Sequence, residues 1–133
     1  MVLVRAIYCS TVNGIGDKEI EAILDKSRAN NALDNITGAL IYDGQHFLQC
    51  LEGGRQSVSK RFLVISQDYR HKNVELIDFS VIKERRFPQW TMAYAGSSGL
   101  DTGIISAYSS DGFNPRKMIF PDAIVEMMWR LSQ

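Results

Sequence analysis

His46-Phe47-Leu48-Gln49-Cys50-Leu51-Glu52-Gly53 is a largely apolar segment that is closed by Gly53-Gly54. It predicts a short strand, because side chains alternate between the two faces of a strand and both faces here are largely apolar. One face carries Phe47, Gln49 and Leu51, and the other carries Leu48 and Cys50. This pattern is typical of a central strand that is covered on both sides. Gln49 therefore points into a packed layer, where an unpaired amide costs about 1–3 kcal/mol and needs a partner.

The overall composition limits the class of protein. The chain has 133 residues, 45% of them apolar, which fits one domain with a packed core. Its 15 basic and 15 acidic side chains give a formal net charge of zero. A balanced charge argues against direct nucleic-acid binding and against a polybasic membrane-surface protein.

Targeting signals and metal-ligand patterns are absent from the sequence. No apolar run of about 18 residues could span a membrane, and the N-terminus lacks a secretion signal, so we expect a cytoplasmic protein. The two cysteines, Cys9 and Cys50, lie in strand-like runs and are expected to be buried free thiols. The chain has only 2 histidines, far apart in sequence, and we expect no metal site.

Hydrophobic periodicity predicts the order of the secondary structure elements. Strands are predicted at 2–10, 36–42, 46–53, 74–82 and 89–94, and helices at 17–31, 55–69 and 121–130. Asp17 is the expected N-cap of the first helix, and Asn30-Asn31 are expected to end it in a left-handed conformation. Asp43-Gly44 predicts a tight hairpin turn. The stretch from 96 to 115 is rich in glycine and serine and is expected to be loop.

This order predicts an α+β fold with a ferredoxin-like βαββαββ sheet, two helices on one face and a C-terminal helical cap. We expect the first and third strands to be adjacent, central and parallel, and the right-handed crossovers to place both main helices on one face. Tyr8 and Gln49 are then neighbours on the helix-covered face. The terminal helix is too apolar for free exposure, so we expect it to pack on the second face or on a partner.

The polar residues show no arrangement typical of an enzyme. No Ser/His/Asp order, carboxylate pair, P-loop or Rossmann glycine pattern is present. Taken singly, Tyr8, Asn31 and Gln49 are most simply a core tyrosine, a helix-end residue and a buried amide bonded to backbone or water. These separate interpretations do not explain why all of these residues occur together, in this order, in one chain.

The chain resembles the BLUF domain family, blue-light sensors that bind a flavin. The matching blocks, which together cover roughly residues 2 to 95, are Ile7-Tyr8-Cys9-Ser10, Ser27-Arg28-Ala29-Asn30-Asn31, Ile36-Thr37-Gly38, Phe47-Leu48-Gln49-Cys50-Leu51-Glu52-Gly53, Asp68-Tyr69-Arg70-His71 and Arg86-Phe87-Pro88-Gln89-Trp90-Thr91-Met92. Each block alone is weak evidence, but the blocks in this order are strong evidence.

The resemblance implies a role for each matching residue. Tyr8 gives an electron and a proton to the excited flavin, and Gln49 lies between Tyr8 and the flavin ring. Trp90 and Met92, in the last predicted strand, respond to Gln49. The residues expected to bind the flavin are Tyr8, Ile23, Ser27, Asn30, Asn31, Phe47, Gln49, Ile65, Arg70 and His71. Among these, Asn31 bonds the carbonyl and imide edge, Ile23 and Ile65 sandwich the ring, and Arg70 and His71 lie beside the ribityl and phosphate end. Lys83, Arg85 and Arg86 are outside this functional set.

The resemblance also implies a function. We expect a non-enzymatic photoreceptor with a sensor core at 1–95 and a helical extension at 96–133 that is too short for a catalytic output domain. FAD is the expected cofactor, although FMN and riboflavin carry the same ring. We expect signalling through the last strand and the C-terminal helices to an unidentified protein partner, and self-assembly into a homo-oligomer. The alternatives are an interaction module without a chromophore, and a small enzyme that uses Arg70 and His71 on a phosphate or acyl substrate.

Overall fold

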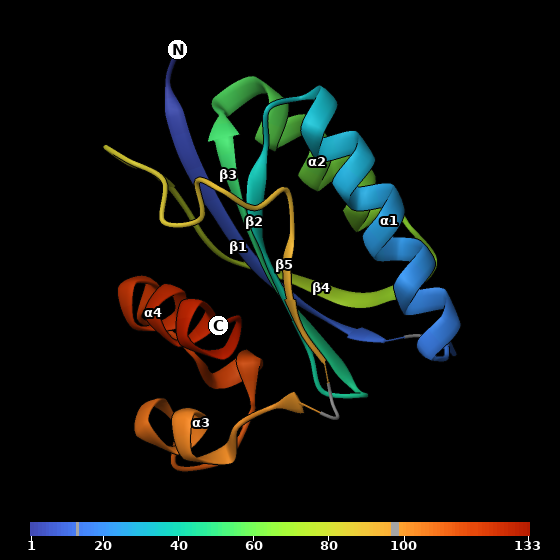
Figure 1. Cartoon of the computed structure of the whole chain (residues 1–133), viewed down its shortest axis with the longest axis vertical. Helices are drawn as coiled ribbons and strands as arrows, with labels where there is room; N and C mark the ends of the chain where they lie inside the picture. Colours follow the sequence, from blue (N-terminus) through green and yellow to red (C-terminus); the bar gives the residue numbers. More distant parts are fainter. Residues whose placement is uncertain (13, 97–98) are drawn as a thin grey trace.

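The protein is described by a computed structural model that covers residues 1–12, 14–96 and 99–133. Its elements are β1 (Leu3–Val12), α1 (Asp17–Leu33), β2 (Thr37–Tyr42), β3 (His46–Gly54), α2 (Arg55–Ser66), β4 (His71–Val81), β5 (Ala93–Ala95), α3 (Thr102–Tyr108), the 3-10 helix η2 (Pro115–Lys117) and α4 (Pro121–Leu131). The strands form one five-stranded sheet in the order β4-β1-β3-β2-β5 (Figure 1). The predicted α+β, ferredoxin-like fold is confirmed.

The central pair of strands differs from the prediction in direction. β1 and β3 are adjacent, as expected, but they run antiparallel, with Tyr8 opposite Gln49. The α1 crossover leaves β2 parallel to β1 with one strand position open between them. The tight turn at Gly44, whose φ is +96°, reverses the chain so that β3 fills that position antiparallel to both neighbours. Tyr8 and Gln49 remain neighbours because register, and not strand direction, brings them together.

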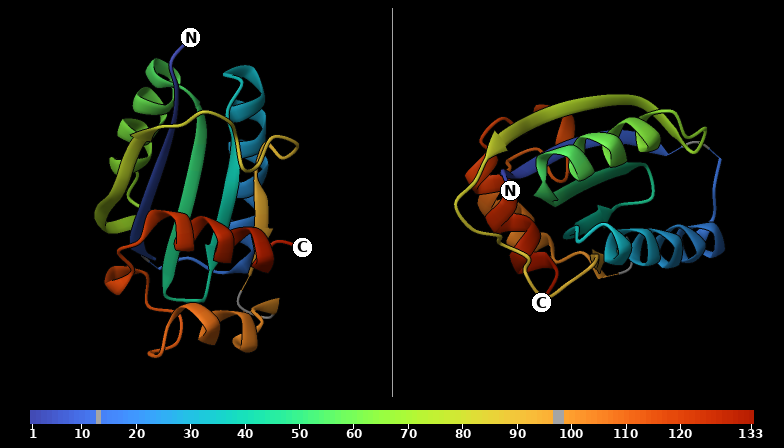
Figure 2. Two further views of the ribbon diagram at one scale, coloured as in Figure 1. Left: turned by 90° about the vertical axis from the view of Figure 1, so that its left-hand side faces the viewer. Right: turned by 90° about the horizontal axis from the view of Figure 1, so that it is seen from above.

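The sheet has two covered faces. Helices α1 and α2 lie over one face, while α3 and α4 lie on the other side (Figure 2). Phe47 and Leu51 of β3 belong to the apolar cluster under α1 and α2, whereas Leu48 and Cys50 belong to the cluster that includes α4. The alternation predicted for β3 is therefore confirmed.

Several element boundaries differ from the predictions. α1 continues past Asn31 to Leu33, and the residue with a left-handed φ of 55° is Asn35. Gly16, and not Asp17, is the N-cap of α1, where the Glu19 carboxylate accepts a hydrogen bond from the Gly16 backbone N–H. α2 is shorter than predicted and β4 begins earlier. β5 is confined to Ala93–Ala95.

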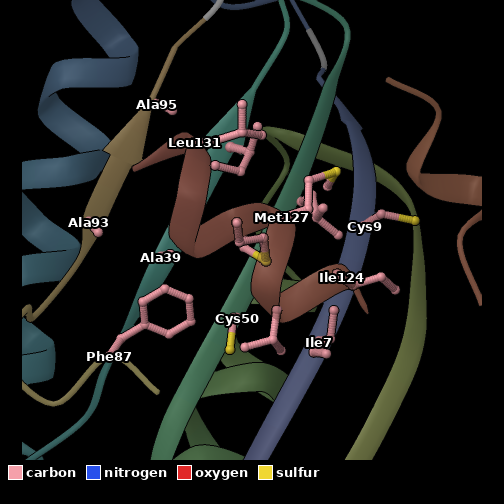
Figure 3. Close-up of a cluster of buried hydrophobic side chains, with 14 of the residues drawn as sticks. Ile7, Cys9, Ala39, Cys50, Phe87, Ala93, Ala95, Ile124, Met127 and Leu131 are labelled. Atoms are coloured by element: carbon pink, nitrogen blue, oxygen red, sulfur yellow. The ribbon is translucent and has the colours of Figure 1, made fainter. Parts of the chain in front are cut away.

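The C-terminal extension packs against the sheet. Its terminal helix α4 places Ile124, Met127 and Leu131 in the cluster with Ile7, Cys9 and Cys50 (Figure 3). α3 forms where a loop was predicted, since the Asp101 carboxylate accepts from the Gly103 and Ile104 N–H groups and caps it. Asn13, in the predicted loop after β1, and Ser97 and Ser98, in the predicted loop after β5, lie outside the described residues. Among the described residues, no helix is long and apolar enough to cross a membrane.

Candidate functional site

A cavity lies between α1, α2 and the sheet face that they cover. Every residue predicted to bind the cofactor lines it: Tyr8, Ile23, Ser27, Asn30, Asn31, Phe47, Gln49, Ile65, Arg70 and His71. These residues come from β1, α1, β3, α2, the turn before β4 and the first residue of β4. The fold therefore brings together side chains that are separated by nearly half of the sequence.

Tyr8 and Gln49 form the centre of this site. They face each other across the β1–β3 ladder, and the Tyr8 hydroxyl donates to Gln49 Oε1. Tyr8 is fully buried and Gln49 is 5% exposed. Burial, with the charge of Asp68 as a smaller cause, raises the pKa of Tyr8 well above its usual value. The phenol is consequently neutral at physiological pH and acts as a hydrogen-bond donor.

The other end of the Gln49 amide contacts Met92. Gln49 Nε2 donates to the Met92 sulfur across 3.4 Å. A thioether is a weak acceptor, so this bond is weaker than the one to Tyr8. Both ends of the Gln49 amide are thus partnered within the protein, one strongly and one weakly.

The segment from 90 to 92 is held by donors from α1 and β2. The Trp90 carbonyl accepts from the Gly38 N–H at 3.1 Å, and the Thr91 carbonyl accepts from Asn31 Nδ2 at 2.8 Å. The Met92 carbonyl accepts from Arg28 Nε at 3.1 Å and Arg28 Nη2 at 3.0 Å. At Thr91 and Met92, side-chain donors take the place of strand pairing, which explains why β5 begins only at residue 93.

Trp90 and Met92 therefore precede the last strand, contrary to the prediction that they lie in it. They also lie on different sides of the sheet. Met92 is buried in the cluster under α1 and α2, whereas Trp90 is partly buried against the opposite cluster, with its ring 6.4 Å from that of Phe87. Neither residue lines the cavity, and only Met92 contacts a residue that does.

Polar groups at the start of β4 close one end of the cavity. The Arg70 guanidinium bonds both oxygens of Asp68, and its hydrogen bonds lower the pKa of Asp68 to about 2. His71 Nδ1 lies 2.7 Å from Ser10 Oγ. Burial lowers the pKa of His71, although Asp68 opposes this shift, so the imidazole is neutral at pH 7.

Sequence reasoning missed part of the site. The further lining residues are Lys26, Leu40, Leu51, Arg61, Val64 and Asp68. Arg28 was also missed, although it lies three residues before Asn31 on α1 and so on the same helical face. Arg61 is four residues before Ile65, and the same spacing would have placed it at the cavity. Arg61 Nε is buried and has no hydrogen-bond partner among the described residues.

Two observations limit what the cavity holds. No cluster of three or more potential metal ligands occurs among the residues that the structure describes. The cavity measures about 90 Å³, which is below the roughly 300–1,000 Å³ typical of ligand pockets. A ligand of that ordinary size is therefore larger than the cavity as it stands in this structure.

Comparison with known families shows to which family the chain belongs. The family model described as "Sensors of blue-light using FAD", BLUF, matches residues 3–93. The chain belongs to the BLUF family. The matched region contains Tyr8, Gln49 and Met92, together with every cavity-lining residue.

BLUF proteins of different lengths resemble this chain. It is 30% identical to BlsA in its photo-activated state, with a TM-score of 0.84 over 97% of this chain and 94% of BlsA. It is 30% identical to BlrB in its dark state, with a TM-score of 0.80 over 98% of this chain and 96% of BlrB. It is 35% identical over 85 residues to photoactivated adenylate cyclase subunit beta of Euglena longa, which is 63% of this chain but only 10% of that protein.

The chemistry of the BLUF cavity fits a flavin. Ile23 and Ile65 supply apolar side chains from two different helices, as a flat ring requires. Gln49 of β3 and Asn31 of α1 supply amides, which match the donors and acceptors of an imide edge. The unpartnered Arg61 Nε–H offers one more donor in the cavity wall for a carbonyl or phosphate oxygen.

Proposed function

We propose that this chain is a blue-light photoreceptor that binds a flavin non-covalently, with FAD as the native cofactor. The observation that carries the proposal is the hydrogen bond from Tyr8 to Gln49 in the wall of a cavity lined by Ile23, Ile65 and Asn31. FMN and riboflavin share the ring that these residues would contact. Selection of FAD would then depend on the Arg70 and His71 end of the cavity.

Tyr8 and Gln49 would carry the light response. A bound flavin supplies a strong oxidant when it absorbs blue light. Tyr8 is the nearby electron donor, and the proton that its oxidised phenol releases has Gln49 Oε1 as its acceptor. Return of the electron and proton restores the phenol, while the Gln49 amide is left rotated or tautomerised.

Met92 would sense the change in Gln49. In the present arrangement Gln49 Nε2 donates to the Met92 sulfur. Rotation of the amide by half a turn places Oε1 against that sulfur, so that two acceptors face each other. Met92 then has to move, and its movement pulls on the 90–92 segment.

The signal would leave through the C-terminal helices. Trp90 packs against the cluster that contains Met127 and Met128 of α4, and the Arg86 guanidinium lies 4.8 Å from the ring centre of Trp129. We propose that α4 transmits the response to a separate protein and that the chain itself catalyses no reaction. Co-purification from dark and illuminated cells tests this step, and identical partner sets in both conditions would contradict it.

Self-assembly is part of the same proposal. Ile119 and Phe120, directly before α4, are 70% and 69% exposed, which is unusual for two adjacent large apolar residues. We propose that the protein functions as a homo-oligomer. Light scattering coupled to size-exclusion chromatography tests this, and a single monomeric peak at all concentrations would contradict it.

The colour of the protein tests the proposed function as a whole. Purified protein, or protein incubated with FAD, is expected to be yellow and to show a small, reversible red shift of the flavin spectrum in blue light. Protein that stays colourless after incubation with FAD would contradict the proposal. It would favour the interaction module without a chromophore. The enzyme alternative is less well supported, because Arg70 is engaged by Asp68 and His71 by Ser10.

A further inference from the structure

Glu52 is a fully buried carboxylate that the proposed photochemistry does not use. It lies on β3 and is 0% exposed. Strand alternation places its side chain on the same face as Cys50, the face that α4 covers, and it does not line the flavin cavity. A buried ionised carboxylate is unfavourable unless charge and hydrogen bonds compensate it.

Donors from two parts of the chain surround this carboxylate. Arg5 of β1 contacts Glu52 Oε2 through Nε at 2.8 Å and through Nη2 at 2.7 Å. The backbone N–H groups of Arg86 and Phe87 donate to Oε1 at 2.9 and 2.8 Å. Arg5 compensates the charge, while the backbone bonds attach the connection between β4 and β5 to the central strand.

The attachment at Glu52 and the contact between Gln49 and Met92 hold the two ends of one segment. Arg86 and Phe87 begin the segment that ends at Met92, and Met92 accepts from Gln49. Gln49 and Glu52 are three residues apart on β3, or about 10 Å along the strand at about 3.3 Å per residue. The segment from 86 to 92 is therefore held to the same strand at both ends, on opposite faces of the sheet.

We propose that Glu52 is a positioning residue for the photoresponse, acting as the fixed anchor against which the 90–92 segment moves. This inference rests on the proposed function. Its physical basis is the difference between the two attachments. The attachment to β3 at Glu52 is charged, buried and made by several donors, whereas the attachment of Met92 to β3 is a single weak bond to sulfur. The Met92 carbonyl is held separately, by Arg28 of α1.

The anchor also fixes the contacts through which the signal would leave. Phe87, whose N–H is bound by Glu52, is fully buried and points into the cluster beneath α4 (Figure 3). Its ring is the packing partner of Trp90. Arg86, the other residue bound by Glu52, places its guanidinium over Trp129. An anchor at this point keeps the Arg86 contact with Trp129 in place, so that movement of Met92 passes to α4 through Trp90 and the apolar cluster that Trp90 shares with α4.

The substitution Glu52→Gln tests the anchor with almost no change in size. Glutamine has one acceptor oxygen and an amino group that donates, so it cannot accept from both Arg5 and the Arg86 and Phe87 amides. We expect full flavin content and a normal red shift, with dark recovery faster by about threefold or more because the segment is released at one end. The control is Val58→Ala, which removes buried methyl groups from α2 in the other apolar cluster.

Recovery of Glu52→Gln at the wild-type rate would overturn the inference, and so would equal acceleration in Val58→Ala. A purely structural role would lower the melting temperature of both variants and leave their recovery below that temperature unchanged. Absence of any red shift in the wild-type protein would instead contradict the proposed function, so the two failures are distinguishable.

Amide hydrogen exchange on the wild-type protein decides the matter if Glu52→Gln does not fold. We expect the amides of Arg86 and Phe87 to be protected in the dark and to stay protected in the light, while the amides of Thr91 and Met92 change. Loss of protection at Arg86 and Phe87 in the light to the same extent as at Thr91 and Met92 would overturn the inference. Rapid exchange at Arg86 and Phe87 in the dark would do so as well.

Discussion

The amide nitrogen of Gln49 donates to the sulfur of Met92 across 3.4 Å, while the oxygen of the same amide accepts from Tyr8. This links a buried side chain in the cavity to the segment that leads into β5. The bond to sulfur is the weaker of the two, so it is the one that rearrangement of the amide breaks first.

Met92→Leu removes the sulfur and nearly preserves the volume. We expect a stability loss below about 1.5 kcal/mol, unchanged flavin binding and an altered rate of dark recovery, because Gln49 Nε2 loses its acceptor. The control is Met127→Leu, a fully buried methionine in the cluster beneath α4. An unchanged recovery rate in Met92→Leu would show that the sulfur contact has no part in the response.

Asn31→Ala tests the amide that joins α1 to the same segment. Asn31 is 1% exposed and donates to the Thr91 carbonyl at 2.8 Å. Its removal takes the donor from the partly buried Thr91 carbonyl, and we expect a loss of about 1–3 kcal/mol in the free energy of unfolding together with weaker FAD binding. Asn30→Ala is the control, with a smaller effect expected on both. Denaturant titration and FAD titration measure the two quantities, and equal effects of the two substitutions would contradict the assignment.

The Asp68–Arg70 pair predicts a dependence of stability on pH. Hydrogen bonds from Arg70 lower the pKa of Asp68 from 3.8 to about 2 in the folded protein. The carboxylate therefore stabilises the fold fully above the unfolded-state pKa, and this contribution is lost as the pH falls toward 2. We expect the wild type to be more stable than Asp68→Asn at pH 6. This difference in stability is expected to vanish as the pH approaches the folded-state pKa of Asp68. A urea midpoint difference that is constant from pH 6 to about pH 2 would refute this linkage.

Gly38 is a position where any side chain is excluded. A Cβ atom there would lie 1.9 Å from the Cys50 carbonyl oxygen, which is backbone and cannot rotate away. Gly38→Ala is expected to cost about 3 kcal/mol or more, as severe overpacking does. Gly99→Ala, where a Cβ would meet nothing within 4 Å, is the control and is expected to be nearly neutral. Thermal melts compare the two, and equal melting temperatures would contradict the packing between β2 and β3.

The sequence predicted the sheet, the hairpin and both covered faces, because alternation in β1 and β3 reports burial directly. It did not predict strand direction, since the same alternation is compatible with β3 parallel or antiparallel to β1. It also began β5 too early, because Thr91 and Met92 have strand-like side chains but bond through their carbonyls to Asn31 and Arg28.

The candidate site was predictable where a residue's identity is unusual for its position. Gln49 in an apolar strand is of this kind. The paired asparagines on α1 were predicted through the resemblance to the BLUF family, since taken singly they are ordinary residues for a helix end. Arg28 and Arg61 were missed because an arginine on an exposed helix surface is ordinary, and only the fold directs them to Met92 and the cavity. The burial of Glu52 was equally hidden, since its donors Arg86 and Phe87 are distant in sequence.

The most direct test of the central claim is the light-minus-dark absorption spectrum of FAD-loaded wild type and Gln49→Leu, with the exposed Gln56→Leu as control. We predict a reversible red shift in the wild type and in Gln56→Leu. We predict equal flavin content but no red shift in Gln49→Leu, because leucine has neither the acceptor for Tyr8 nor the donor for Met92. A red shift that persists unchanged in Gln49→Leu would contradict the account.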